Sequence, residues 1–220
     1  MNKNLSVLWK EHKMLLIITS CVILLQTVVG VMLWDRLPDP IATHFDMNNQ
    51  PDGWSSKAFT VFGMPLIMLV LHWICLAVSY APNRQQAYGP KVRYVLLLTV
   101  PAVTLLMTVL CYGYALGIPF NVGRVVLPFV GVIFVLVGNY LPKLRRNPTV
   151  GIRLPWTLMD DENWHKTHRF AAPVWVVGGL LLIVLGLTGY TSWPAMAAIF
   201  AIILLPTGYS FILYLKKNDQ

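Results

Sequence analysis

The sequence predicts an all-α fold, a polytopic membrane bundle of six transmembrane helices with both termini in the cytoplasm. Composition is the first observation: hydrophobic residues make up 56% of the 220 residues and charged residues only 12%. A soluble domain of this length carries about twice that charged share and cannot bury so much apolar surface. The second observation is six apolar stretches, and the third is an alternation of charge between the segments that join them.

Each predicted span approaches or exceeds the roughly 20 residues that a helix needs to cross a bilayer. The spans cover approximately residues 14–33, 62–80, 94–117, 125–141, 173–189 and 196–215. We expect the short fourth and fifth spans to extend into their neighbouring loops. The first span is too long for a signal peptide and no small-residue cleavage site follows it, so we expect it to remain as an anchor.

The distribution of Lys and Arg orients the spans. Alternate segments, both termini included, hold 14 of the 17 basic residues, and the intervening segments hold 3. The positive-inside rule then places both termini in the cytoplasm. In a membrane protein, an excess of basic residues, here a net charge of +8, is typical of loops that lie at an anionic membrane surface. We therefore expect the lipid bilayer as a partner and no direct nucleic acid binding. We expect a first part, residues 1–93, with an extracellular loop at 34–61, and a second part, residues 94–220, with a cytoplasmic loop at 142–172.

The predicted spans are nearly free of ionisable side chains, with His72 as the exception and Gln26 as its possible partner. An ionisable residue inside a membrane is a functional candidate by default. With no acidic partner in the spans, we favour a neutral histidine bonded to Gln26 or to a carbonyl group. Coupled transport needs carboxylates or unwound polar sites near the midplane. Small-molecule or lipid transport is therefore the alternative function, not the preferred one.

The extracellular loop reads LPDPIATHFDMNNQPDGWSSK from Leu37 to Lys57. Its prolines and its turn signals predict a compact, ordered cap. Its acids oppose a basic peptide and its aromatic rings offer apolar contact. The candidate recognition residues are His44, Phe45, Asp46, Asp52 and Trp54. Three of them, His44, Asp46 and Asp52, are also conceivable metal ligands, but acids are common in turns for conformational reasons, and we expect no metal.

The cytoplasmic loop runs from Asn139 to Phe170 and ends in a short charged helix that opens at Thr157 or Asp160, which we interpret as interfacial. The loop combines basic and aromatic residues of the types enriched at binding hot spots, including a Trp156 that we expect to be exposed. The candidate partner-binding residues are Lys143, Arg153, Pro155, Trp156, Trp164, His168 and Arg169. Alternatively, the loop packs on its own helix ends, with Arg153 or Arg169 paired to an acid among Asp160, Asp161 and Glu162. Neither loop carries a phosphate loop, a nucleophile elbow or a zinc motif, so we expect no enzyme and no cofactor.

The two loops together resemble the signatures of the SdpI family of bacterial membrane proteins. The first signature is LPDPIATHFDMNNQPDGWSSK, and the second is NYLPKLRRNPTVGIRLPWTL followed by ENWHKTHRFA. The loops and the six spans match in order, so the resemblance covers essentially the whole chain. Asn49 stands where family members usually have glycine; asparagine tolerates the left-handed conformation, so we expect the turn to be kept.

The resemblance implies an immunity protein of the bacterial cytoplasmic membrane that protects the cell from a secreted, SdpC-type peptide toxin. It also implies a receptor that captures a cytoplasmic transcriptional repressor at the membrane and so relays the presence of the toxin. A secreted peptide toxin and a cytoplasmic repressor are therefore the expected partners.

Overall fold

A computed structural model describes residues 3–79, 90–190 and 192–218 of the chain. Six of its helices are long and apolar enough to cross a membrane, over residues 13–32, 59–78, 97–115, 122–143, 161–188 and 193–217. This confirms the predicted helical bundle, and the fourth and fifth spans do extend beyond the predicted bounds. The predicted end of the second span, at residue 80, lies outside the described residues. The cytoplasmic location of both termini stays a prediction.

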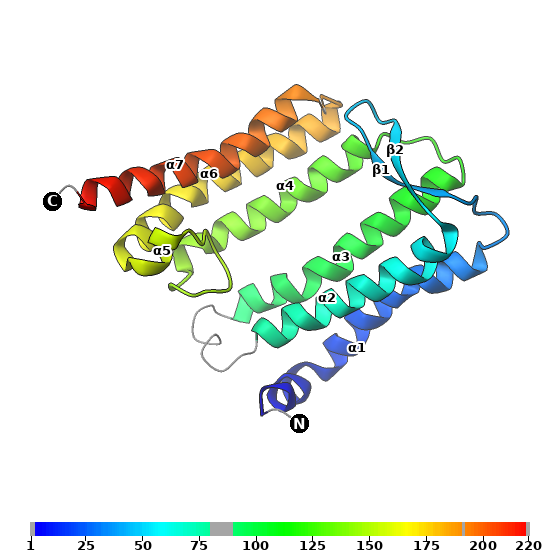
Figure 1. The fold of residues 1–220 in the computed structure, drawn as a ribbon, viewed down its shortest axis with the longest axis horizontal. Helices are drawn as coiled ribbons and strands as arrows, with labels where there is room; N and C mark the ends of the chain where they lie inside the picture. Colours follow the sequence, from blue (N-terminus) through cyan, green and yellow to red (C-terminus); the bar gives the residue numbers. More distant parts are fainter. Residues whose placement is uncertain (1–2, 80–89, 191, 219–220) are drawn as a thin grey trace. The chain divides into compact units, whose positions relative to one another are not determined.

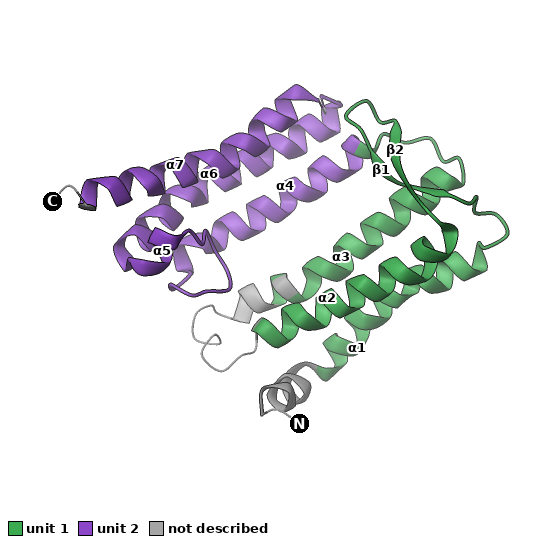
Figure 2. Ribbon diagram, viewed as in Figure 1, with its two compact units in different colours: residues 1–82, 93–122 green, residues 83–92, 123–220 purple. Residues whose placement is uncertain are grey.

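The chain divides into two compact units, shown in Figure 2. Unit 1 comprises residues 1–82 and 93–122, and unit 2 comprises residues 83–92 and 123–220. The third span thus groups with the first two, whereas the division at residue 93 assigns it to the C-terminal part. The division at residue 93 stays a prediction.

Unit 1 consists of three long helices and a β-hairpin (Figure 1). Its elements are α1 (Lys3–Met32), β1 (Ile41–Phe45), β2 (Pro51–Ser55), the π-helical turn η1 (Phe59–Gly63), α2 (Met64–Ser79) and α3 (Pro90–Ala115). Leu16, Leu76 and Leu97 are buried together and join the three helices. A second buried cluster, which includes Ile41 and Tyr112, connects the base of the hairpin to the helices. The hairpin is therefore held on a packed apolar base.

The hairpin is antiparallel, with Ile41 paired to Ser55 and Ala42 paired to Trp54. Lys57 fixes its base, because its Nζ donates to the carbonyl oxygens of Trp34 (3.1 Å) and Leu37 (3.0 Å) just after α1. These carbonyls at a helix end have no partners within the helix, so the ammonium group satisfies them. The outer loop is therefore an ordered cap, as predicted.

Unit 2 consists of α4 (Val122–Tyr140), the 3-10 turn η2 (Leu141–Lys143), α5 (Pro155–Met159), α6 (Asp161–Thr188) and α7 (Trp193–Asn218). Helices α6 and α7 lie side by side along their length (Figure 1). Helix α4 approaches α6 at Gly131 and Gly179, where a Cβ on either glycine would overlap the backbone of the other helix. Small residues of this kind allow close backbone packing in membranes, where association depends on van der Waals contact.

The expectation of a separate interfacial helix before the fifth span is wrong. Residues 161–188 form one continuous helix of 28 residues, with Pro173 inside it. A proline interrupts a single backbone hydrogen bond, and membrane helices tolerate this loss when neighbouring groups satisfy the freed carbonyl. The charged segment that was expected to lie along the membrane is therefore the first part of the fifth spanning helix.

Candidate functional site

The hairpin turn is built on the carboxylate of Asp46. Its Oδ1 accepts hydrogen bonds from the backbone N–H groups of Asn48 (2.9 Å) and Gln50 (2.8 Å). The bond from Gln50, followed by those from Asn48, holds the pKa of Asp46 below its usual value. Because its pKa is lower in the folded state, the ionised carboxylate of Asp46 stabilises the folded turn at neutral pH. This stabilisation is lost as the pH falls through the lowered pKa. Asp46 therefore shapes the turn and does not lie open as a free carboxylate.

Asn49 connects the hairpin to the segment between α3 and α4. Its backbone has a φ of 64°, the left-handed conformation expected at this position. Its side chain accepts a hydrogen bond from the Val122 N–H (2.6 Å) and donates one to the Phe120 carbonyl (3.2 Å). A glycine would adopt the same turn but would lack both of these bonds.

The other outer candidates differ in exposure. His44 and Asp52 form an exposed cross-strand pair, with 2.5 Å between Nδ1 and Oδ1. Phe45 packs edge-on against Tyr114 of α3, with ring centroids 4.8 Å apart, and so supports the hairpin. The Trp54 side chain is free for a partner, because 53% of this residue is exposed. Among the five predicted recognition residues, the exposed ones are therefore Trp54, His44 and Asp52.

His72 lies fully buried inside unit 1, but Gln26 is not its partner. Its Nε2 lies 3.0 Å from the hydroxyl of Thr19, and that hydroxyl also donates to the Leu15 carbonyl (2.9 Å). The hydroxyl has one proton, so it donates either to the carbonyl or to Nε2, and the tautomer of His72 determines which of the two. The Gln26 amide instead points to the Thr60 carbonyl, at 3.5 Å. Gln26 follows Thr19 by about two helical turns, so only Thr19 is level with His72.

The cytoplasmic loop has a buried centre made by Trp164 and His168 of α6, whose rings stack with centroids 4.0 Å apart. His168 Nδ1 donates to the Trp164 carbonyl (2.7 Å), and its Nε2 accepts from the Ile152 N–H (2.9 Å). Trp164 Nε1 donates to the Leu144 carbonyl (2.9 Å). These two side chains therefore hold both halves of the loop against α6, and their rings are not part of its surface.

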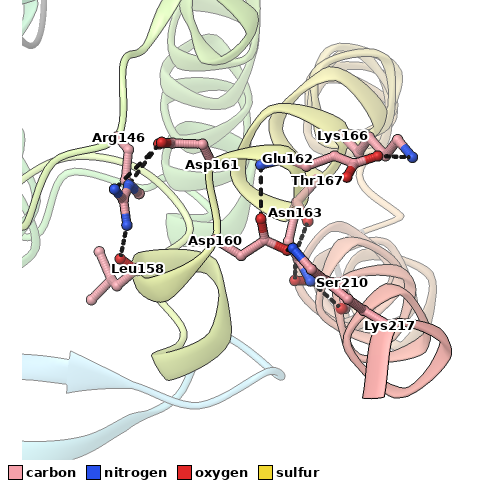
Figure 3. Close-up of polar contacts among 10 residues, drawn as sticks. All are labelled: Arg146, Leu158, Asp160, Asp161, Glu162, Asn163, Lys166, Thr167, Ser210 and Lys217. Atoms are coloured by element: carbon pink, nitrogen blue, oxygen red, sulfur yellow. Dashed lines mark hydrogen bonds and ion pairs between the residues drawn. The ribbon is translucent and has the colours of Figure 1, made fainter. Parts of the chain in front are cut away.

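A polar network ties α5, α6 and α7 together, and Figure 3 shows the part of it that joins α6 to α7. The hydroxyl of Ser210 donates to Asn163 Oδ1 (2.7 Å) and accepts from Trp156 Nε1 (2.9 Å). Asn163 Nδ2 donates to the Ser210 carbonyl (3.0 Å), and Thr167 donates to Asn163 Oδ1 (2.9 Å). Trp156 is thus half-buried, and the expectation that it is exposed is wrong. Buried networks with every partner satisfied fix one arrangement of their helices.

Two ion pairs surround this network, both visible in Figure 3. Arg146 Nε lies 2.6 Å from Asp161 Oδ1, and Lys217 Nζ lies 3.0 Å from Asp160 Oδ2. Burial acts to raise the pKa of Asp160, but the hydrogen bond and charge of Lys217, together with the Glu162 N–H, lower it overall. The loop therefore packs on its own helix ends, with Arg146 and Lys217 in place of the expected Arg153 and Arg169.

The remaining candidates lie on the surface of the loop. Lys143, Arg153, Pro155 and Arg169 are exposed. Arg153 is held by a hydrogen bond from its Nη1 to the Pro148 carbonyl (2.7 Å). Residues that the sequence did not single out include Ser210, Lys217 and the 82% exposed Met159. No local motif marks the first two, because their partners lie about 50 residues away along the chain.

Among the described residues, no three His, Cys, Asp or Glu side chains gather as metal ligands do. The outer cap and the cytoplasmic loop instead present hydrogen-bonding and apolar groups on ordered supports. Such surfaces suit recognition of another molecule.

Comparisons with known proteins agree with the resemblance of the two loops. Residues 143–213 match the model of the SdpI/YfhL protein family, and residues 21–69 match a domain of unknown function, DUF1648. The chain is 27% identical over 209 residues to the immunity protein SdpI of Bacillus subtilis (strain 168), covering 93% of this chain and 98% of that protein. No solved structure matches. The first match covers most of the cytoplasmic loop, α6 and most of α7, and the similarity to SdpI extends over nearly the whole chain. With its six membrane-spanning helices, the chain is a multi-pass protein of the cell membrane that is similar to the SdpI/YfhL family.

Proposed function

We propose that this chain is a membrane immunity protein that protects its cell from a secreted peptide toxin. The observation that carries the proposal is the similarity to the immunity protein SdpI over 93% of this chain and 98% of that protein. A relative that matched the spans alone would support only a shared membrane fold.

The outer cap is the proposed site of toxin recognition. Its turn and its base are fixed by Asp46, Asn49 and Lys57, so the exposed Trp54 is presented on an ordered support. A large exposed aromatic residue on a preorganised element gives binding energy at a low entropic cost. Asp52, beside His44, adds a carboxylate that attracts a basic peptide.

Protection of toxin-sensitive cells tests this site. Cells that express the wild-type chain survive an SdpC-type peptide at a concentration that kills cells with an empty vector. Trp54→Ala lowers that tolerance without lowering the amount of protein in the membrane. The matched control is Trp193→Ala, since Trp193 is 76% exposed and lies outside the cap. Equal tolerance of the Trp54 variant and the wild type would exclude the cap as the recognition site.

We further propose that the cytoplasmic loop is the output of a signalling function and recruits a repressor protein. The buried centre at Trp164 and His168 fixes the loop, and Arg153 and Pro155 lie exposed on it. Guanidinium groups presented at fixed positions are common in binding hot spots. In this proposal, Trp164 and His168 support the surface that the partner contacts.

A separation of functions tests the output. Arg153→Ala abolishes toxin-induced expression of the immunity genes, while protection from the toxin is kept. Arg145→Ala is the control, because Arg145 is also exposed and precedes the buried part of the loop. If Arg153→Ala removes protection and signalling together in a correctly inserted protein, the loop belongs to the immunity mechanism and has no separate output.

A further inference from the structure

One face of the α6–α7 pair carries a charged pocket of about 250 Å³ at the end where α6 begins and α7 stops. Its charged lining consists of Asp160, Glu162, Lys166, Lys216 and Lys217. Three ammonium groups face two carboxylates, so the lining has one excess positive charge. The charge asymmetry of the sequence predicts that this end lies at the cytoplasmic surface of the membrane.

An apolar groove of about 400 Å³ lies farther along the same two helices. Val174, Val177 and Leu181 of α6 and Ala198, Ala201 and Leu205 of α7 line it. The alanines leave room between larger neighbours, and Val177 and Leu205 are exposed. The groove therefore exposes a shallow apolar surface to the hydrocarbon region of the membrane.

The pocket and the groove belong to one continuous stripe. Lys166, Phe170, Val174, Val177 and Leu181 succeed one another every three or four residues, the spacing of side chains on one face of a helix. Ala198, Ile202, Leu205, Tyr209, Leu213 and Lys216 have the same spacing on α7. Between pocket and groove, Phe170 and Tyr209 stack with ring centroids 4.5 Å apart. Aromatic residues at the boundary of charged and apolar surface are typical of the membrane interface.

We propose that this stripe binds one anionic phospholipid, with its phosphate in the charged pocket and an acyl chain along the apolar groove. The length agrees: Lys166 and Leu181 are about 22 Å apart along an α-helix, and half a bilayer with its headgroups is roughly 20–22 Å thick. The lipid thus covers a helix face that has apolar side chains over its inner part and lysines at its end.

The charges select the class of headgroup. Glu162 is paired with Lys166 (2.6 Å), and Asp160 is paired with Lys217 (3.0 Å). An ethanolamine or choline headgroup needs a free carboxylate for its cation, and the pocket has none. Lys216 has no ion pair with any described residue, so its ammonium group is available for a phosphate oxygen. An anionic headgroup such as that of phosphatidylglycerol fits this pocket best.

Native mass spectrometry of the full chain in detergent tests the headgroup contact, with phosphatidylglycerol, phosphatidylethanolamine and phosphatidylcholine of equal chain length as probes. The wild type binds phosphatidylglycerol most tightly. The double variant Lys166→Gln, Lys216→Gln weakens the binding of phosphatidylglycerol by about fivefold per lysine. The single variant Lys216→Gln also weakens it, and this substitution leaves the Glu162–Lys166 and Asp160–Lys217 ion pairs intact. Arg145→Gln removes the same charge outside the pocket and leaves the binding unchanged.

The groove is tested separately. Ala201→Phe fills it and lowers the binding of phosphatidylglycerol, whereas Ile203→Phe, at an exposed position outside the groove, does not. Unchanged lipid binding in the double lysine variant overturns the proposal. Displacement of the lipid by inorganic phosphate alone would show a phosphate site in place of a lipid site. A wild-type dimer that Ala201→Phe converts to a monomer would identify a second copy as the occupant.

Discussion

Gly151 marks the point where the cytoplasmic loop passes over the stacked rings of Trp164 and His168. Its φ of +121° lies in the region that favours glycine, and a Cβ there would overlap His168 and approach Trp164 within 2.9 Å. A side chain at this position therefore faces two separate costs, backbone strain and a steric overlap with a buried ring.

Gly151→Ala is predicted to lower the free energy of unfolding by about 2–6 kcal/mol, since strain and overpacking each cost about 1–3 kcal/mol. The measurement is denaturant-induced unfolding in mixed micelles. Gly208→Ala in α7 is the control, because a Cβ there meets nothing within 4 Å. Equal effects of the two substitutions would show that the loop does not pack on α6 as described.

Two substitutions at Asn49 measure separately the contributions of its backbone conformation and of its side-chain hydrogen bonds to stability. Asn49→Gly keeps the left-handed turn but loses the bonds to Phe120 and Val122, for an expected loss of about 1–2 kcal/mol. Asn49→Ala loses the same bonds and adds about 1–2 kcal/mol for the left-handed conformation. Thermal unfolding of both variants measures the difference, and identical stabilities would argue against the φ of 64°.

The left-handed turn at Asn49 could be predicted from the sequence because the cause is local: a turn signal and an asparagine that accepts a positive φ. The partners of Asn49 could not, since they lie 71 and 73 residues away along the chain. The partner of His72 could not be predicted either, because its contact with Thr19 depends on how α1 and α2 are aligned along their axes.

At the scale of elements, α6 combines two roles in one helix. Its membrane part packs on α4 and α7, and its first turns carry Asn163, Trp164, Thr167 and His168, which organise the cytoplasmic loop. Hydropathy marks where a membrane segment is apolar, but it does not mark where a helix begins. The sequence therefore predicted the fifth span and the charged helix before it as two separate elements, whereas they form the single helix α6.

Ser210→Ala tests the network that joins α5, α6 and α7. The substitution leaves the indole N–H of Trp156 without its acceptor, which is expected to cost about 1–3 kcal/mol. Thr207→Ala is the control on the same helix, since its hydroxyl bonds only to the Ile203 carbonyl one turn away (2.8 Å). Unfolding of both variants in micelles gives the comparison, and a neutral Ser210→Ala would contradict the network.

At the scale of the whole molecule, the charge distribution predicts sidedness. In a variant that lacks Cys21, Cys75 and Cys111, a cysteine at Ser56 is expected to react with a membrane-impermeant maleimide in intact cells. A cysteine at the 82% exposed Met159 is expected to react only after permeabilisation. Equal labelling of both positions in intact cells would contradict the assignment of the cap to the outside and the loop to the inside.

The central claim is immunity, and survival of a toxin-sensitive strain that lacks its own immunity protein tests it most directly. The measured quantity is the lethal concentration of an SdpC-type peptide for cells that express this chain, compared with cells that carry an empty vector. The account predicts a clear rise in the lethal concentration at equal growth rates without toxin. An unchanged lethal concentration, with the full-length protein present in the membrane, would contradict immunity against this class of toxin.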